Sequence, residues 1–459
     1  MSEQQNRREF LSRVALGTMG TIGAGALLNS CASARPVMEP TGRFASEEDV
    51  INMRNEAPDG PPLRAGLIGC GGRGTGAAIN FVDAGPNLEI VALADVFQDQ
   101  LDGCRKNLKE ARDIDVANNR CYVGFDAYKD LLHSGIDIVL IATPPIFRAE
   151  HVREAIEADV HIFQEKPVAI DPSGTRYMTE LMQQARDKGL CQVTGTVRKY
   201  QKDYIETRRR VANGAIGEVT GATFLRNGGA LWWVERRPEW SDLEYMLRNW
   251  GNFQWASGDH IIEMFIHELD VMNWYMDGNP ESAFGYGGRH QRQSGDMYDF
   301  FSVEYNYGKG KRVTCAVRQI NGMGNGKREI IQGSEGYADA SGIIYNLDGE
   351  EVWRYPHPRE QDADQRWAVT NPFVQEHIEL VTAIRTGGYI NDTAAQIDTC
   401  NVAILGREAA YTGQNLTWDE LVNMDKSYDL GVYDFNRSYE VPDKAPVPGT
   451  EAAPAQRYA

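Results

Sequence analysis

The 459-residue chain is 42% hydrophobic and 24% charged, which is typical of a globular protein long enough for two domains. Its net charge of −18 argues against nucleic acid and anionic lipid surfaces as partners, although solubility alone can also account for this charge. No uncharged apolar run after residue 31 is long enough to cross a membrane.

The first predicted element is NRREFLSRVALGTMGTIGAGALLNSC, residues 6–31. The adjacent Arg7 and Arg8 before a short glycine-rich apolar run predict a twin-arginine signal, an address for proteins that fold before export. Its end is similar to a lipoprotein box with the lipid on Cys31, and cleavage after Ala34 is the alternative. We therefore expect a protein of the periplasm or cell envelope, with membrane contact only through a lipid anchor.

Residues 32–62 are polar and proline-rich, which predicts a linker. From residue 63 to residue 195, apolar strands alternate with helical stretches, and this order is typical of a parallel sheet covered by helices. The expected strands are 63–68, 89–95, 137–145 and 160–167, with a first helix near 74–83.

The pattern changes in the second predicted domain, residues 196–425. Apolar and polar residues alternate there, which predicts a mostly antiparallel sheet with one covered face. C-terminal helices can pack back on the first domain, and residues 426–459 read as an extended, loose tail. The six cysteines beyond Cys31 show no paired spacing, so we expect free, mostly buried thiols. The expected strands are 219–228, 300–308, 312–320 and 328–336, and the expected helices are 373–386 and 394–411.

A GxGxxG motif follows the first apolar strand and precedes a helix. In a dinucleotide fold, Gly69 permits the tight turn, Gly71 lets the pyrophosphate approach the backbone, and Gly74 lets helix and strand pack closely. Asp95 ends the second strand, where a carboxylate binds ribose hydroxyls and repels a 2′-phosphate, so NAD is favoured over NADP. A glycine turn in a fold without nucleotide is the alternative. The candidate cofactor-binding residues are Gly69, Cys70, Gly71, Gly72, Arg73, Gly74, Asp95, Thr143, Pro144, Glu165 and Lys166.

Two later motifs carry candidate chemistry. Lys166, in the sequence Glu-Lys-Pro, follows a parallel strand and so lies at the ligand-binding edge, although an ordinary surface lysine fits this motif too. At about 100° per residue, Asp259, Glu263, His267 and Asp270 fall within about 80° of one helix face, which His260 flanks. This face carries only acids and imidazoles.

Such a face predicts catalysis by His267, whose ordinary pKa lies near neutrality, with Glu263 orienting it. A merely satisfied helix face is the alternative. A metal site made of His260, Glu263 and His267 is a further reading, but nicotinamide chemistry needs no metal, and we expect none.

These motifs resemble the Gfo/Idh/MocA oxidoreductases, the family of glucose–fructose oxidoreductase and inositol dehydrogenase. The resemblance covers roughly residues 63–420 and includes GLIGCGGRG, IATPP, EKP and the HELDV run from His267. It implies a Rossmann domain followed by an α/β domain whose open antiparallel sheet mediates oligomers, such as a dimer or tetramer. It also implies that Lys166 lies near nicotinamide and that His267 is the acid/base. Family members carry Asp at the position of Glu263, so the longer side chain moves the charge.

The remaining candidates concern the substrate. Five of the nine tryptophans lie between residues 232 and 255, and aromatic faces can stack on sugars, although a hydrophobic cluster or subunit contact fits as well. Arg236 and Arg237 lie in the same stretch. The candidate substrate-binding residues are Arg198, Tyr200, Trp232, Trp233, Asp259, His260 and Asp270.

We therefore expect an NAD-dependent oxidoreductase that acts on a sugar, glycoside or polyol and is exported with its cofactor already bound. One alternative is a glycoside hydrolase of the family 109 type, which oxidises and re-reduces its substrate on bound NAD. The other is a non-catalytic sugar-binding envelope lipoprotein.

Overall fold

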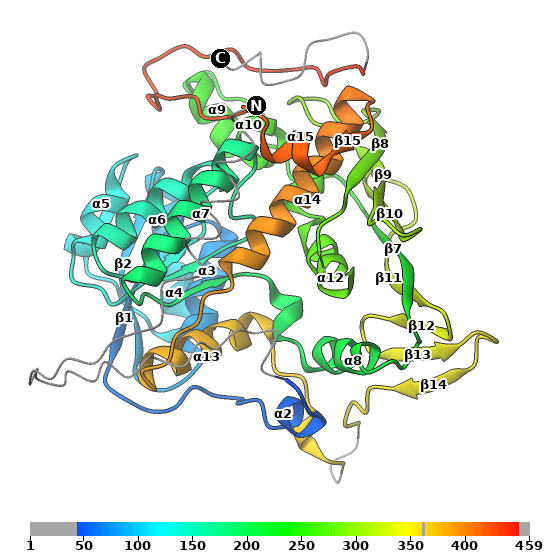
Figure 1. The fold of residues 1–459 in the computed structure, drawn as a ribbon. Coiled ribbons are helices and arrows are strands. Elements are labelled where there is room, and N and C mark those ends of the chain that lie inside the picture. The colour runs from blue at the N-terminus through cyan, green and yellow to red at the C-terminus, as the bar shows by residue number, and fades with distance from the viewer. Residues whose placement is uncertain (1–43, 277, 360–362, 449–459) are drawn as a thin grey trace, which may run out of the picture. The chain divides into compact units, whose positions relative to one another are not determined.

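The computed structural model describes residues 44–276, 278–359 and 363–448, which contain two sheets (Figure 1). The predicted export signal and Cys31 lie outside the described residues. Within the described ranges, no helix is both long and apolar enough to span a membrane. The cysteines of these ranges are six free thiols, of which all except Cys121 are buried, as expected.

The first sheet is the predicted parallel Rossmann sheet, with strand order β3-β2-β1-β4-β5-β6. Its strands are buried apolar runs, and β4 is buried along its whole length because helices cover both faces. The order reverses between β1 and β4, and in such sheets the ligand crevice lies at the carboxyl ends of these strands. The strands are β1 Leu63–Ile68, β2 Leu88–Asp95, β3 Cys121–Val123, β4 Ile138–Ile141, β5 His161–Gln164 and β6 Gln192–Thr194.

Five helices follow the strands of this sheet. Glycine begins the first of them, and the fifth begins with Asp171 as N-cap, whose carboxylate accepts from the Gly174 N–H at 2.6 Å. The helices are α3 Gly72–Val82, α4 Gln98–Arg112, α5 Ala127–Leu132, α6 Arg148–Glu157 and α7 Pro172–Asp187.

The second sheet has nine strands and is mostly antiparallel, as predicted, although β10 pairs with β7 in parallel. In β10, Val313, Cys315 and Val317 alternate with exposed or half-buried residues, so one face of the strand points into the core. The strands are β7 Val219–Gly228, β8 Ser282–Gly288, β9 Phe300–Asn306, β10 Arg312–Gln319, β11 Gly326–Gly333, β12 Gly336–Asp339, β13 Ile343–Asn346, β14 Glu351–Arg354 and β15 Leu416–Thr417.

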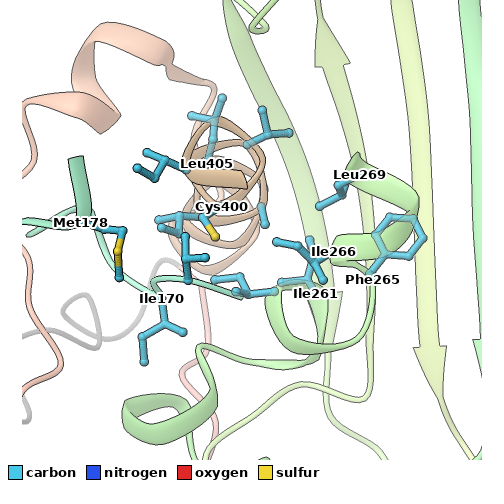
Figure 2. Close-up of a cluster of buried hydrophobic side chains, with 14 of the residues drawn as sticks. Ile170, Met178, Ile261, Phe265, Ile266, Leu269, Cys400 and Leu405 are labelled. Atoms are coloured by element: carbon cyan, nitrogen blue, oxygen red, sulfur yellow. The ribbon is translucent and has the colours of Figure 1, made fainter. Parts of the chain in front are cut away.

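The helix α14 (Thr393–Thr412) connects the two halves of the core. It packs against α7 of the first domain and against β8, β9 and α12 of the second. In Figure 2, Ile170 and Met178 approach it from one side, and Ile261, Ile266 and Leu269 from the other. The site helices are therefore held against the Rossmann domain by a shared apolar core. The remaining helices are α2 Glu47–Ile51, α8 Lys202–Ala212, α9 Asp242–Arg248, α10 Gln254–Ser257, α11 His260–Glu263, α12 Ile266–Met276, α13 Pro372–Arg385 and α15 Trp418–Val422.

The chain differs from the predicted linker and tail at both ends of the described part. Within residues 44–62, α2 has a capping box from Ser46 to Asp49, and its Val50 packs against Ile205. Beyond residue 425, Lys426 and Tyr428 are buried, so the segment is extended but attached to the body. Apolar and ionic anchors spaced along these segments explain why they pack although their composition is that of a loose chain.

Candidate functional site

The glycine turn after β1 is built for close backbone packing. Gly69 has φ +95°, and a Cβ there would lie 2.8 Å from the Thr143 nitrogen. A Cβ at Gly74 would lie 1.8 Å from the Gly69 carbonyl oxygen, so only glycine permits α3 to approach β1. A Cβ at Gly71 or Gly72 would meet no heavy atom closer than 4.0 Å, and this open space is where a dinucleotide pyrophosphate fits.

Asp95 stands at the carboxyl end of β2, beside this turn. Its carboxylate accepts from the Cys70 N–H at 2.7 Å and from the Phe97 N–H at 2.8 Å. Burial raises the pKa of Asp95, and the two N–H donors act against that rise. The half-buried carboxylate is thus held at the position where a ribose binds in a dinucleotide fold. The residues of the turn and of β2 therefore fit the group that the motif implies.

Arg73 and Glu165 pair with each other. The Arg73 Nε lies 2.9 Å from Oε1 of the buried Glu165, and its guanidinium lies 4.8 Å from the ring centre of Phe373 on α13. These two candidates therefore tie the glycine turn to the end of β5, which is a positioning role. Contact of Glu165 with a cofactor is not supported by this geometry.

The loop after β4 is fixed by two residues that the sequence reasoning did not select as site residues. The hydroxyl of Thr143 lies 3.1 Å from His151 Nδ1, and Arg148 Nε donates to the Thr143 carbonyl at 3.0 Å. Burial lowers the pKa of His151 to about 3 and that of Arg148 to about 10. His151 is therefore neutral and positions the loop of Thr143 and Pro144.

Lys166 reaches from the end of β5 to the second domain. Its Nζ lies 2.9 Å from Oε1 of Glu263 and also donates to the Glu263 carbonyl oxygen. Burial alone would raise the pKa of Glu263, but Lys166 and Arg148 hold it below its usual value. The pair is therefore an ionised lysine–carboxylate contact at the carboxyl edge of the sheet.

The predicted single helix from 259 to 270 is wrong. It is broken into α11, which ends at Glu263, and α12, which begins at Ile266. Asp259 has φ +79° and caps α11, and the Glu263 carbonyl accepts from Lys166. Asp259, Glu263, His267 and Asp270 therefore do not share one continuous helix face, and of these four only Glu263 and His267 lie near Lys166.

His267 is half-buried in the first turn of α12. Burial lowers its pKa well below the usual value, and the positive charges of Lys166 and Arg226 lower it further. Across the described ranges, its ring has no hydrogen-bond partner. At neutral pH, His267 is therefore a neutral imidazole that can accept a proton.

The domain architecture and these motifs match a known family. Residues 63–194 match the "Oxidoreductase family, NAD-binding Rossmann fold", and residues 204–339 match the "GFO/IDH/MocA C-terminal domain". Together these matches cover more than half of the chain. The chain belongs to the Gfo/Idh/MocA oxidoreductase family. The family model that its first domain matches describes an NAD-binding Rossmann fold.

Relatives of this Gfo/Idh/MocA protein have named activities. A glycosyl hydrolase family 109 protein of Shewanella baltica (strain OS155 / ATCC BAA-1091) is 27% identical over 61% of this chain and 57% of that protein. The D-glucoside 3-dehydrogenase of Escherichia coli (strain K12) is 28% identical over 46% of this chain and 53% of that protein. The chain thus spans little more than half the length of these two relatives.

Among solved structures, scyllo-inositol dehydrogenase from Lactobacillus casei with bound NAD(H) and scyllo-inositol has a TM-score of 0.58. It is 17% identical and covers 78% of this chain and 99% of that one. This likeness shows the shared fold.

Three of the expected substrate contacts of this Gfo/Idh/MocA protein are buried structural groups. Asp259 and His260 are fully buried, and the Asp259 carboxylate accepts from His260 Nδ1 at 2.8 Å and from the Tyr411 hydroxyl. Tyr200 is buried, and its hydroxyl donates to Asp392 at 2.7 Å. These groups hydrogen-bond inside the protein, and of their side-chain atoms the buried His260 Nε2 has no partner among the described residues. Their burial does not support the predicted substrate role.

Asp270, a fourth expected substrate contact, is also hydrogen-bonded inside the protein. It is buried and accepts from Lys199 Nζ at 2.7 Å and from the Thr399 hydroxyl at 3.1 Å. Because Lys199 precedes α8 and Thr399 is on α14, this network joins three elements. The role of Asp270 is therefore to hold α12 in place.

Two charged residues of the second sheet, Arg226 and Lys327, lie close enough to His267 for their charges to lower its pKa. The sequence reasoning missed both. On β7, Arg226 Nη1 lies 2.8 Å from Glu268 Oε1, and on β11, Lys327 Nζ lies 3.0 Å from Glu329 Oε2. Arg226 shares the face of buried Phe224, as Glu329 shares that of buried Ile331. A charged residue in register with buried apolar ones was the available signal.

The other substrate candidates lie at different places. Arg198 is half-buried, stacks on the Tyr204 ring at 5.1 Å and contributes to the low pKa of His267, so it belongs near the site. Trp232 and Trp233 are 45% and 39% exposed and pack on Trp250 and Tyr245. Arg198 therefore lies close enough to influence His267. The two tryptophans pack against residues in and beside α9. Within the described ranges, no group of three acids, histidines or cysteines could hold a metal ion.

Proposed function

We propose that this Gfo/Idh/MocA protein is an NAD-dependent dehydrogenase that acts on a hydroxyl group of a sugar, glycoside or polyol. The observation that carries the proposal is the Lys166–Glu263 pair, at 2.9 Å, beside a His267 whose pKa is well below its usual value. An unprotonated imidazole that can accept a proton and a cation at the carboxyl edge of a dinucleotide sheet are the groups that alcohol oxidation needs.

Each of the three site residues has its own part in this reaction. Neutral His267 accepts the hydroxyl proton, and Lys166 stabilises the negative charge that grows on the substrate oxygen. Glu263 holds the Lys166 ammonium in this position through its carboxylate and its carbonyl. The bound nicotinamide supplies the hydride chemistry.

The substrate class is supported by the site and by the relatives. The Arg226–Glu268 and Lys327–Glu329 pairs offer charged donors and acceptors of the kind that bind several hydroxyl groups. A D-glucoside 3-dehydrogenase is among the relatives, and an inositol dehydrogenase shares the fold. The Asp95 carboxylate favours NAD over NADP because it repels a 2′-phosphate.

A glycoside hydrolase with no net redox change is the second candidate. The glycosyl hydrolase family 109 relative matches over 61% of this chain, which is the observation that favours it. In that case His267 and Lys166 would serve a transient oxidation of the sugar, and aglycone elimination and addition of water to the unsaturated ketone would follow before re-reduction.

One experiment separates the candidates. The purified protein is incubated with a panel of sugars, polyols and aryl glycosides, with and without added NAD⁺, while NADH absorbance and aglycone release are recorded. NADH formation that the His267→Gln variant loses supports the dehydrogenase. Aglycone release without NADH formation supports the hydrolase. If neither His267→Gln nor Lys166→Ala lowers any measured activity, the remaining interpretation is a non-catalytic binding protein.

We also propose that the enzyme is exported through its twin-arginine stretch and carries its cofactor out of the cytoplasm. The support is the composition of residues 6–31, together with the lack of a dinucleotide pool outside the cell. Fractionation of cells that express the Arg7→Lys, Arg8→Lys double variant tests it, because export should stop while NAD binding persists.

Assembly of identical copies through the nine-stranded sheet is a further part of the proposal. Phe284 and Tyr286 on β8 are 51% and 61% exposed, so this face of the sheet presents two large aromatic side chains to solvent. Light scattering of the purified protein should give a dimer or tetramer, and Phe284→Ser with Tyr286→Ser should reduce it to smaller species.

A further inference from the structure

Aromatic side chains follow three strands of the Rossmann sheet, two on one side of β1 and one on the other. Phe97 follows β2, Phe125 follows β3, and Phe147 follows β4. The ligand crevice of such a sheet lies outside these carboxyl ends, and the adenosine end of a dinucleotide lies by the acid that ends β2. Phe97 donates its backbone N–H to that acid, Asp95, at 2.8 Å.

A segment from the far end of the chain covers these aromatic residues. We call Leu430–Tyr439 the strap. Its Phe435 stacks on Phe97 with ring centres 5.8 Å apart and an interplanar angle of 22°, and it lies 4.9 Å from the Phe125 ring. Its Tyr433 lies 4.8 Å from the Phe147 ring. The strap therefore touches the loops that follow β2, β3 and β4.

Anchors on both sides hold the strap in place. Before it, the Tyr428 N–H donates to Asp171 at 2.8 Å, and the Tyr428 hydroxyl donates to Gln254 on α10 at 3.2 Å. At its end, the Tyr439 N–H donates to Asp242 on α9 at 3.1 Å. The red C-terminal segment in Figure 1 accordingly runs past α9 and α10.

The strap is also a closed loop in itself, since the Tyr439 hydroxyl donates to the Val432 carbonyl at 2.8 Å. Between the anchors, Val432 and Asp434 are exposed, while Tyr433 and Phe435 are half-buried against the strand ends. The aromatic side chains are thus directed at the cofactor edge, and the polar backbone of the strap stays in water.

A residue of the second domain also contacts Phe97. Arg248 on α9 lies over the Phe97 ring at 4.1 Å and pairs with Asp99 at 3.0 Å. Phe97 therefore contacts both the strap and α9, and it is the residue whose N–H binds Asp95.

We propose that the strap completes the dinucleotide site at its adenosine end and slows release of the cofactor. Adenine has an aromatic face that stacks on such side chains, and the cofactor can leave only when Phe435 and Tyr433 move from the strand ends. The strap thereby supplies the long cofactor retention that an enzyme working away from a dinucleotide pool requires. The inference rests on dinucleotide binding by the first domain and is independent of the proposed substrate.

The test measures NADH release from the full-length protein by stopped-flow fluorescence, with excess NAD⁺ as competitor and no substrate present. Phe435→Ala should release NADH roughly five- to tenfold faster. The matched control is Val432→Ala, on the exposed side of the same loop, which should stay within about twofold of the parent protein. Unchanged release from Phe435→Ala overturns the proposal, as does slower release, which would mean that the strap competes with the cofactor.

A second measurement covers the case in which Phe435→Ala does not fold. In the unaltered protein, hydrogen exchange of residues 430–439 should slow when NADH binds. Exchange that NADH leaves unchanged in the strap overturns the proposal. Failure of the dehydrogenase proposal would appear separately, as NADH binding without substrate turnover.

Discussion

The ammonium group of Lys166 lies 2.9 Å from the carboxylate of Glu263 and also donates to the carbonyl oxygen of the same residue. This double contact joins the end of β5 to the end of α11, so the Rossmann domain and the second domain share one charged group. The break between α11 and α12 lies at the same place, and it sets His267 at the start of a new helix.

Removing the charge of Glu263 should therefore affect catalysis more than folding. Glu263→Gln keeps a similar shape but holds the Lys166 ammonium less firmly, and we expect kcat/KM to fall roughly tenfold to a hundredfold. Glu263→Asp, which keeps the charge on a shorter arm, should lose less. Steady-state kinetics with thermal unfolding as the folding control measure both, and an unaltered kcat/KM in Glu263→Gln would contradict this role of the pair.

The activity should persist at acidic pH. Burial and nearby cations lower the pKa of His267, so the imidazole stays deprotonated, and able to act as a base, well below pH 6.5. With a neutral polyol substrate, kcat/KM for oxidation should stay level as the pH falls through 6.5 and should decline only further down. His267→Gln should reduce kcat by roughly 10²- to 10⁴-fold at every pH. A decline centred near pH 6.5 would show that His267 titrates as an exposed histidine.

Asp392 should make the folded state less stable as the pH rises from about 4 to 6. Burial raises its pKa from 3.8 to about 6, so the folded protein binds a proton that the unfolded chain has already released. Its contribution to the free energy of unfolding is fully present below pH 3.8 and is lost as the pH rises past 6. The upper value of this contribution is about 3 kcal/mol.

Comparison of the parent protein with the Asp392→Asn variant isolates the pH-dependent contribution of Asp392 to the free energy of unfolding. The amide keeps a partner for Tyr200 and Thr194 but does not titrate, so the difference in unfolding free energy should move in favour of Asn as the pH rises. Denaturant unfolding at pH 4, 5 and 6 measures it. A constant difference across these three values would rule out the titration.

Gly74 should be intolerant of any side chain. A Cβ there would lie 1.8 Å from the Gly69 carbonyl, and the obstacle is backbone, so α3 would have to move from β1. We expect Gly74→Ala to lower the free energy of unfolding by roughly 1–3 kcal/mol and to weaken NADH binding. The matched control is Gly103→Ala in α4, which meets nothing within 4 Å and should stabilise the protein by about 0.5–1 kcal/mol. Equal melting temperatures for the two variants would contradict the close-packing argument.

Much of the first domain could be predicted because its signals are local. Gly69, Gly74 and Asp95 lie within two strands and a turn, and the backbone conformation of that turn admits few residue types. The candidate site was predicted less completely. Lys166 was predicted from its place after a parallel strand and His267 from a helix face, and the family resemblance added their roles. Arg226 and Lys327 belong to strands that approach His267 only in the folded second domain.

The amino-acid sequence by itself determined the parallel sheet, the glycine turn, the acid after β2 and the alternation of the second sheet, because these depend on neighbouring residues. Tertiary structure alone decided which polar residues are buried beside partners from distant parts of the chain. Tyr200 and Asp259 look reactive in the sequence, yet Asp392 and Tyr411, far along the chain, satisfy them inside the protein. The strap shows the same limit, since the contact of Phe435 with Phe97 joins residues that no local pattern relates.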